Sequence, residues 1–209
     1  MKKKNVLVGM VLVILVLATA CGPAVPEYKK GTITDTSYQS EWIGLAWTAP
    51  EGFVLATQEE MDAFMDASVD QVVQDEEMAE SAKSAATYEM IAQAETGMPN
   101  IMVIVEKLAV PNMKEEAYFE MFKTTMEANA ASMGLTYTYG DLQEVTVGGQ
   151  PFQMATSTVD VGGVTRLQEV YFQSKGNYMI ILTVSFDEST QEQKEEMMAA
   201  FTPYEASAA

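Results

Sequence analysis

Hydrophobic residues recur along this chain with two spacings, every second position in some segments and every third or fourth position in others. Alternation is typical of β-strands, whereas the wider spacing is typical of amphipathic helices. The alternating and continuously apolar segments predict strands over residues 42–47, 53–56, 88–94, 101–108, 137–147, 152–161, 164–173 and 178–186. Residues 178–184 are apolar on both faces, which predicts a central strand that is covered on both sides.

Two segments between these strands carry apolar residues at helical spacing. The first begins at Thr57, which forms a capping box with Glu60, and we expect it to continue, with a break, to Lys83. The second begins at Asn112, and Glu115 completes its cap. The apolar stripe of this second helix consists of Phe119, Phe122, Met126, Ala130 and Met133. We expect that stripe to lie on the sheet.

Glycine-containing turns separate the last four strands, and a short helix follows them. The three turns are Gly148-Gly149, Gly162-Gly163 and Gly176-Asn177. Glycine readily supplies the positive φ of tight hairpins, so these strands should form an antiparallel meander. The last helix is expected over residues 190–201, with Ser189 and Glu192 as its cap. The sequence therefore predicts the α+β class, with a twisted, mainly antiparallel sheet and helices on both faces, an α/β/α sandwich.

The N-terminus combines a basic start, an apolar run and a lone cysteine. Three lysines precede an apolar run over residues 6–20, and Cys21 is the only cysteine. A spanning helix needs about 20 apolar residues, so the shorter run is typical of an export signal, although an uncleaved signal anchor is the alternative. The segment Leu17-Ala18-Thr19-Ala20-Cys21 resembles the bacterial lipobox. That resemblance implies a lipoprotein in which Cys21 is the lipid attachment site, carrying palmitate or a similar acyl chain.

These features divide the chain into four predicted parts. Residues 1–20 form the signal peptide, residues 21–40 the lipidated cysteine and a flexible tether, residues 41–204 a single domain, and residues 205–209 a frayed tail. The tether is predicted because Pro23 and Pro26 are followed by a polar stretch without periodicity. The expected location is the extracytoplasmic face of the cell membrane, with the membrane as a partner through the lipid anchor.

Charge and composition exclude several classes of function. Three of the 12 basic residues and none of the 30 acidic residues precede Cys21, which leaves 30 acidic against 9 basic residues and a formal net charge of −21. Such an acidic protein repels phosphate backbones, so no nucleic-acid partner is expected. The chain has no histidine, the usual general base and a preferred zinc ligand. We therefore expect no catalytic residue, no cofactor and no metal site.

Two further groups of side chains each have a functional and a structural explanation. Glu59, Asp62, Asp66 and Asp70 share one side of the first predicted helix. They could bind calcium or a basic partner, but a solvated helix face is favoured because calcium sites usually wrap the ion with carbonyl oxygens as well. The 16 methionines are scattered along the chain, which favours core filling over copper(I) binding.

Four aromatic residues also have two explanations. They are Trp42, Trp47, Tyr137 and Tyr139. Tyr137 and Tyr139 share one face of a predicted strand, so the four residues could form a recognition patch, although burial against a helix is favoured.

Several local patterns resemble those of a known family. They are the opening Gly44-Leu45-Ala46-Trp47-Thr48-Ala49-Pro50-Glu51-Gly52-Phe53, the turn Val147-Gly148-Gly149, and the strand at Tyr178 followed by a short helix. Together they look like the PsbP-like fold, shared with the Mog-type proteins, over residues 42–204. The resemblance implies this architecture and a non-enzymatic binding role.

Two classes of function follow from the sequence. The first is a membrane-anchored extracytoplasmic lipoprotein acting as a non-catalytic binding or accessory module, with another envelope protein or a small ligand as its partner. The alternative is a carboxylate-dependent hydrolase acting on cell-wall or extracellular material. An exposed apolar patch would favour the first class, whereas a pocket with converging carboxylates would favour the second.

Overall fold

A computed structural model describes residues 27–72, 76–132, 135–161 and 164–206. The predicted signal peptide, Cys21 and the predicted turn Gly162-Gly163 lie outside the described residues. Within the described part of the chain, no helix is both long and apolar enough to span a bilayer.

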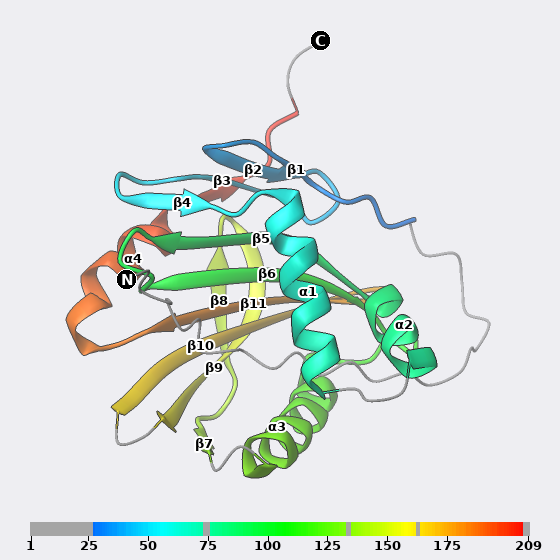
Figure 1. Cartoon of the computed structure of the whole chain (residues 1–209). Helices are drawn as coiled ribbons and strands as arrows, with labels where there is room; N and C mark the ends of the chain where they lie inside the picture. The colour runs from blue at the N-terminus through cyan, green and yellow to red at the C-terminus, as the bar shows by residue number, and fades with distance from the viewer. Residues whose placement is uncertain (1–26, 73–75, 133–134, 162–163, 207–209) are drawn as a thin grey trace.

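The centre of the fold is an eight-stranded antiparallel sheet (Figure 1). Its strands are β4 (Phe53–Leu55), β5 (Ala86–Ala94), β6 (Asn100–Lys107), β7 (Thr136–Tyr139), β8 (Gln143–Val147), β9 (Gln150–Val161), β10 (Val164–Lys175) and β11 (Tyr178–Phe186). Their order is β4-β5-β6-β11-β10-β9-β7, and β8 also pairs with β9. The predicted meander is confirmed, as is the central position of β11 between β6 and β10.

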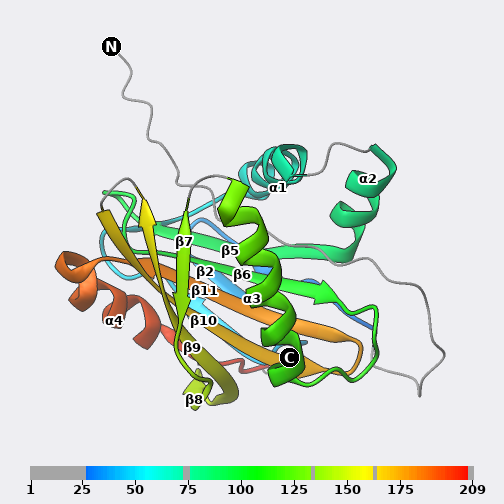
Figure 2. The same ribbon diagram turned by 90° about the horizontal axis from the view of Figure 1, so that it is seen from below.

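Three helices cover one face of this sheet. They are α1 (Gln58–Val72), α2 (Glu76–Ala85) and α3 (Glu115–Ser132), and Figure 2 shows α3 lying across the strands. The predicted capping box is confirmed, because Glu60 N donates to Thr57 Oγ1 at 3.2 Å and Thr57 N donates to Glu60 Oε2 at 2.8 Å. Met61 of α1 and Phe119 of α3 are buried against the sheet. Phe122 is only half-buried, and Met133 lies outside the described residues.

The other face is covered by helix α4 (Gln191–Ala199) together with a second, four-stranded sheet. The strands of this small sheet are β1 (Thr32–Ile33), β2 (Ser37–Ser40), β3 (Leu45–Thr48) and β12 (Phe201–Pro203). Trp47 is 0% exposed between the layers, and its Nε1 donates to Met197 O of α4 at 2.9 Å. The α+β class with helices on both faces is confirmed, and the small sheet is an addition that the sequence did not predict.

The flexible tether predicted over residues 21–40 is wrong in its second half. Strands β1 and β2 belong to the small sheet, and Tyr38 is only 1% exposed. Strands of two and four residues are too short to show a periodic signal, and β2 gains its partner β3 only in the folded chain. The predicted strand 42–47 begins at Leu45 instead, because Trp42 to Gly44 form a turn in which Gly44 has a φ of 90°.

The start of α3 also differs from the prediction. Asn112 has a φ of 56° and is a turn residue whose N–H donates to Gly176 O at 3.0 Å, so it does not cap the helix. The helix begins at Glu115, whose Oε1 accepts hydrogen bonds from Ser174 N and Oγ at 2.7 Å each. A contact with a distant strand therefore determines the position of this helix start.

The predicted strand over residues 137–147 is divided into β7 and β8. The pairing with β9 shifts by one residue between the pair Tyr139↔Ser157 and the pair Gln143↔Met154. Between these pairs, the three residues 140–142 face only the two residues 155 and 156 of β9. Such an extra residue is a bulge that bends the strand.

The cap predicted for the last helix is also wrong. Asp187, not Ser189, caps the 3₁₀ turn Glu188–Thr190 that precedes α4, and its side chain accepts from Ser189 N at 3.0 Å. Phe201 lies beyond the helix and pairs with Trp47 in the small sheet.

Candidate functional site

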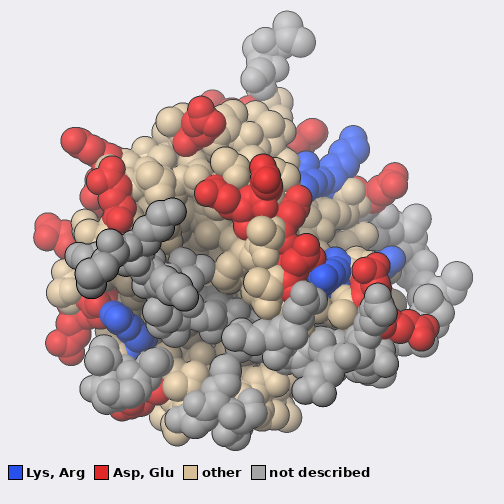
Figure 3. Space-filling model, viewed as in Figure 1, with Lys and Arg blue, Asp and Glu red and all other residues tan. Residues whose placement is uncertain are grey.

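The acidic residues predicted on the first helix form a solvated face. Glu59, Asp62 and Asp66 are exposed on the side of α1 away from the sheet, and acidic side chains predominate on the surface seen in Figure 3. Asp66 pairs with Lys83 of α2 at 2.8 Å, and Asp62 accepts from Gln58 Nε2 at 2.6 Å. The side chain of Asp70 is not among those described. Among the side chains that are described, no group of three or more acidic residues is arranged to hold a metal ion.

The four aromatic residues considered as a patch do not form one surface. Trp47 lies between the main sheet and the small sheet, whereas Tyr139 contacts Phe119 of α3 on the opposite face, with ring centroids 6.0 Å apart. Tyr137 and Tyr139 are half-buried and stacked on each other at 5.9 Å. Burial is therefore confirmed as the main role of the tryptophans.

Core filling is confirmed for about half of the methionines beyond the predicted signal. The methionines buried in the two core clusters are Met61, Met65, Met90, Met102, Met179 and Met197. Met126 of α3 is buried as well. Their flexible thioether side chains fill irregular space between the layers.

A buried carboxyl group holds the N-terminal segment on the main sheet, and the sequence did not reveal it. Glu89 is 1% exposed and is the extra residue of a bulge between Tyr88 and Met90 in β5. Its Oε2 accepts from Tyr38 Oη and from Gly31 N, both at 2.9 Å, and its Oε1 accepts from Tyr28 Oη. We call these residues, Tyr28, Gly31, Tyr38 and Glu89, the Glu89 cluster.

The close approach at Gly31 requires glycine. A Cβ atom there would lie 2.6 Å from Glu89 Oε2 and 2.7 Å from Gln39 O, both far inside normal contact distance. Burial, followed by the nearby charge of Glu89, raises the pKa of Tyr28 and of Tyr38 above the ordinary tyrosine value. Both hydroxyls therefore remain hydrogen-bond donors well above neutral pH.

An aromatic group lies next to the Glu89 cluster. The ring of Tyr28 packs edge-on against Trp42, with ring centroids 5.1 Å apart, and at a tilt of 39° against Tyr178, with centroids 5.5 Å apart. Lys175 Nζ lies 4.9 Å from the centre of the Trp42 ring and donates to Trp42 O, and burial lowers the pKa of Lys175. Trp42 is 8% exposed, and its Nε1 has no hydrogen-bond partner among the described residues. We call Tyr28, Trp42, Lys175 and Tyr178 the Trp42 cluster.

Two other carboxyl groups in the core are bonded to tyrosines. Glu106 accepts from Tyr118 Oη at 2.5 Å on the face that carries α3. Glu169 lies beneath α4, where it accepts from Tyr171 Oη at 2.5 Å and pairs with Lys194 at 2.8 Å. The three carboxyl groups lie under different covering elements, so they do not converge on one cleft.

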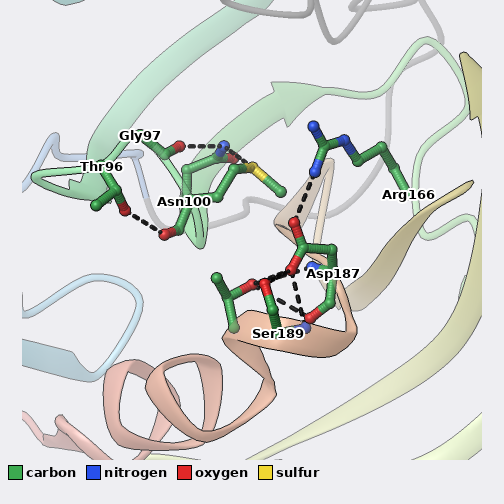
Figure 4. A network of polar contacts seen from close by, with 8 residues as sticks. Thr96, Gly97, Asn100, Arg166, Asp187 and Ser189 are labelled. Atoms are coloured by element: carbon green, nitrogen blue, oxygen red, sulfur yellow. Dashed lines mark hydrogen bonds and ion pairs between the residues drawn. The ribbon is translucent and has the colours of Figure 1, made fainter. Parts of the chain in front are cut away.

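A separate polar network lies at the end of the main sheet that carries the turn between β5 and β6, away from the Trp42 cluster (Figure 4). Arg166 Nη1 of β10 donates to Asp187 Oδ2 at 2.7 Å, and Asp187 also caps the turn before α4. Hydrogen bonds, chiefly from Ser189, lower the pKa of Asp187. The turn between β5 and β6 is closed by Asn100 Nδ2, which donates to Gly97 O at 3.3 Å. The polar groups of this end bond to one another, which is typical of a structural network.

Replacing Asp187 by alanine is expected to lower the free energy of unfolding by about 1–2 kcal/mol, because the substitution removes a cap and an ion pair. The matched control is Glu188→Ala, whose exposed side chain should change stability by less than about 0.5 kcal/mol. Urea denaturation of the two variants measures the difference. Equal losses would contradict the capping role of Asp187.

Comparison with known proteins shows the fold and no more. No protein-family model matches the chain, and no curated protein matches it. Among solved structures, the solution structure of cyanobacterial PsbP (CyanoP) from Synechocystis sp. PCC 6803 is similar at a TM-score of 0.50 and 13% identity, over 89% of this chain and 98% of that one. A crystal structure from Bacteroides thetaiotaomicron VPI-5482 aligns at a TM-score of 0.42 and 9% identity, over 84% of this chain and 51% of that one. This protein therefore has a PsbP-like α+β fold.

One sequence signal could have revealed the Glu89 cluster. Glu89 is the only charged residue in the otherwise uncharged strand β5, and such a residue in a central strand needs a partner when it is buried. The partners, Tyr28 and Tyr38, lie in the segment that the sequence predicts to be a tether. Their distance of 51 residues or more from Glu89 left the pairing invisible before folding.

Proposed function

We propose that this protein is a lipid-anchored extracytoplasmic lipoprotein, attached through Cys21, that acts as a non-catalytic binding or accessory module. Its partner is another envelope protein or a small ligand. The observation that carries the proposal is the export signal ending in a lipobox-like segment at Cys21, followed closely by a folded domain that includes Tyr28. Signal, attachment residue and domain then follow one another in the order of a secreted lipoprotein.

The arrangement of the core carboxyl groups supports a non-catalytic role. Hydrolysis by two carboxyl groups requires the two groups to lie about 5–10 Å apart, on either side of one bond of the substrate. Glu89, Glu106 and Glu169 are instead bonded to tyrosine hydroxyls in separate parts of the core. The PsbP-like fold adds support at the level of architecture alone, since one fold hosts many functions.

The anchor is tested by Cys21→Ala. The variant is expected to lose the mature, lipid-labelled species from the membrane fraction, because no other residue of the chain can form the thioether. Thr19→Ser is the matched control, since it retains a small residue in the same segment and should leave anchoring unchanged. A lipid-labelled, mature-sized Cys21→Ala protein in the membrane fraction would contradict the assignment.

The non-catalytic role is tested against the hydrolase alternative. The purified protein is expected to leave peptidoglycan, peptide and glycoside substrates at background rates. Turnover that disappears in Glu89→Gln, Glu106→Gln or Glu169→Gln, with the fold retained, would replace the binding module by the hydrolase.

A further inference from the structure

We infer that residues 27–31 form a latch that sets how far the domain can move from the membrane, and this inference rests on the proposed anchor at Cys21. The latch lies between the anchor and the first strand, β1. When the latch is closed, the chain is held at Tyr28. When it is open, the chain is first held at Thr32, where β1 pairs with β2. The domain therefore has a short reach and a long reach from the membrane.

Side chains of the domain hold the latch in its closed position. Tyr28 Oη donates to Glu89 Oε1, and Gly31 N donates to Glu89 Oε2 at 2.9 Å. Lys30 Nζ donates to Gln58 Oε1 of α1 at 2.7 Å. The ring of Tyr28 also packs against the other rings of the Trp42 cluster. These bonds all end on side chains, whereas β1 is joined to its neighbour by strand pairing.

The latch can open while the domain stays folded. Residues 27–31 are all exposed or half-buried, whereas Glu89 beneath them is only 1% exposed. The latch itself covers Glu89, since Tyr28 Oη and Gly31 N each lie on one of its two oxygens. When the latch lifts, water can replace these two donors, so the carboxyl group is not left unsatisfied. A terminal segment that is held by a few side-chain contacts opens at a lower free energy than the core strands.

The two positions of the latch differ in the length of free chain between the anchor and the fold. Seven residue steps separate Cys21 from Tyr28, and eleven separate Cys21 from Thr32. The fully extended chain spans about 24 Å when the latch is closed and about 38 Å when it is open, at about 3.5 Å per step. A displacement of the domain beyond the shorter span must break the contacts of Tyr28. Opening therefore adds about 14 Å to the reach.

The latch links the position of the domain to the binding role proposed above. A partner whose docking surface lies within the short reach binds the latched domain directly. A partner beyond the short reach binds only the molecules with an open latch, so its apparent affinity is reduced by the fraction that is open. By the same linkage, binding of this second kind of partner holds the latch open. Opening also removes the ring of Tyr28 from Trp42.

The test uses residues 21–209, which contain the whole described fold, with the thiol of Cys21 coupled to a maleimide lipid in phosphatidylcholine vesicles. This coupling supplies the anchor chemically, so the result does not depend on whether cells lipidate Cys21. A second set of vesicles also carries polyethylene glycol lipids, whose grafted layer is thicker than the short reach and pushes the domain outward. Energy transfer from the tryptophans to a dansyl lipid reports the distance of the domain from the membrane. Amide hydrogen exchange at Gly31 reports the state of the latch.

On the polymer-coated vesicles, energy transfer is expected to fall and exchange at Gly31 to speed up by about tenfold or more, while exchange in β11 stays unchanged. Tyr28→Ala should make exchange at Gly31 fast on both kinds of vesicle, because the substitution removes the hydroxyl and ring contacts. The matched control is Lys29→Ala, which changes an exposed residue of the same segment that makes none of the contacts described above. This control should behave like the parent.

Three results would overturn the inference. The first is a fall in energy transfer with unchanged exchange at Gly31 in the parent, because the domain would then move outward with the latch closed. The second is a parent domain whose energy transfer is the same on both kinds of vesicle. The third is equal acceleration at Gly31 and in β11, because the whole domain would then unfold.

Discussion

Replacing Glu89 by alanine should release residues 27–40 from the domain and lower the free energy of unfolding by about 3–5 kcal/mol. The substitution leaves the hydroxyls of Tyr28 and Tyr38 and the N–H of Gly31 without their acceptor. It also opens a cavity at the bulge of β5. Since Tyr28 and Tyr38 connect the first two strands to the main sheet, the loss should be concentrated in β1 and β2.

Two measurements separate this local release from general destabilisation. Urea denaturation gives the free energy of unfolding, and amide hydrogen exchange in residues 31–40 reports the attachment of the segment. Glu89→Gln is the matched control, because the amide retains one acceptor oxygen and nearly the same volume, and its loss should be about 1 kcal/mol. Gly31→Ala should release the same segment through a different contact, because its Cβ would collide with Glu89. Unchanged exchange of residues 31–40 in both Glu89→Ala and Gly31→Ala would contradict the role of the cluster.

The strands with a strong local signal were predictable from the sequence. In β10 and β11 the apolar residues and the glycine turn point to the same hairpin, and its register follows from the short connection. The capping box at Thr57 was equally readable, because it depends on residues three positions apart. These elements could be predicted because their stabilising contacts lie within a few residues of one another.

The small sheet and the Glu89 cluster could not be predicted in the same way. Strand β3 gains its partner β12 from residues more than 150 positions later, and β1 and β2 are too short for an apolar repeat to mark them. Glu115 likewise marks the start of α3 through a bond to Ser174, 59 residues away. The elements that were predicted wrongly are therefore those whose position depends on contacts between distant residues.

The domain is expected to unfold cooperatively in alkali, between about pH 10 and pH 12. Burial raises the pKa of four tyrosines that are at most 6% exposed, Tyr38, Tyr88, Tyr118 and Tyr171. Three of them also donate to a carboxyl group, Tyr38 to Glu89, Tyr118 to Glu106 and Tyr171 to Glu169. The pKa of Tyr88, raised by burial, is about 12.

Stability falls at high pH because the unfolded chain then binds fewer protons than the folded chain. Above about pH 10 the tyrosines of the unfolded chain lose their protons while those of the folded chain retain them. The stability that the buried tyrosine hydroxyls contribute is therefore fully present below about pH 10. It is lost as the pH rises toward the raised pKa values of these tyrosines in the folded chain. Each buried tyrosine lowers the free energy of unfolding by about 1.4 kcal/mol per pH unit, so four together give about 5 kcal/mol per unit. The lowered pKa of Lys175 acts in the opposite sense but involves a single, half-exposed group.

Urea denaturation at a series of pH values from about 8 to 12 measures this slope, and ultraviolet absorbance of the phenolate reports ionisation directly. Tyr88→Phe is the informative variant, because the hydroxyl of Tyr88 is not bonded to a carboxyl group and the substitution changes the volume little. It should lower the slope by about a quarter while leaving stability at neutral pH within about 1 kcal/mol of the parent. A free energy of unfolding that stays constant to about pH 12, or ionisation of all nine tyrosines near pH 10 in a chain that remains folded, would show that these four hydroxyls are accessible to water.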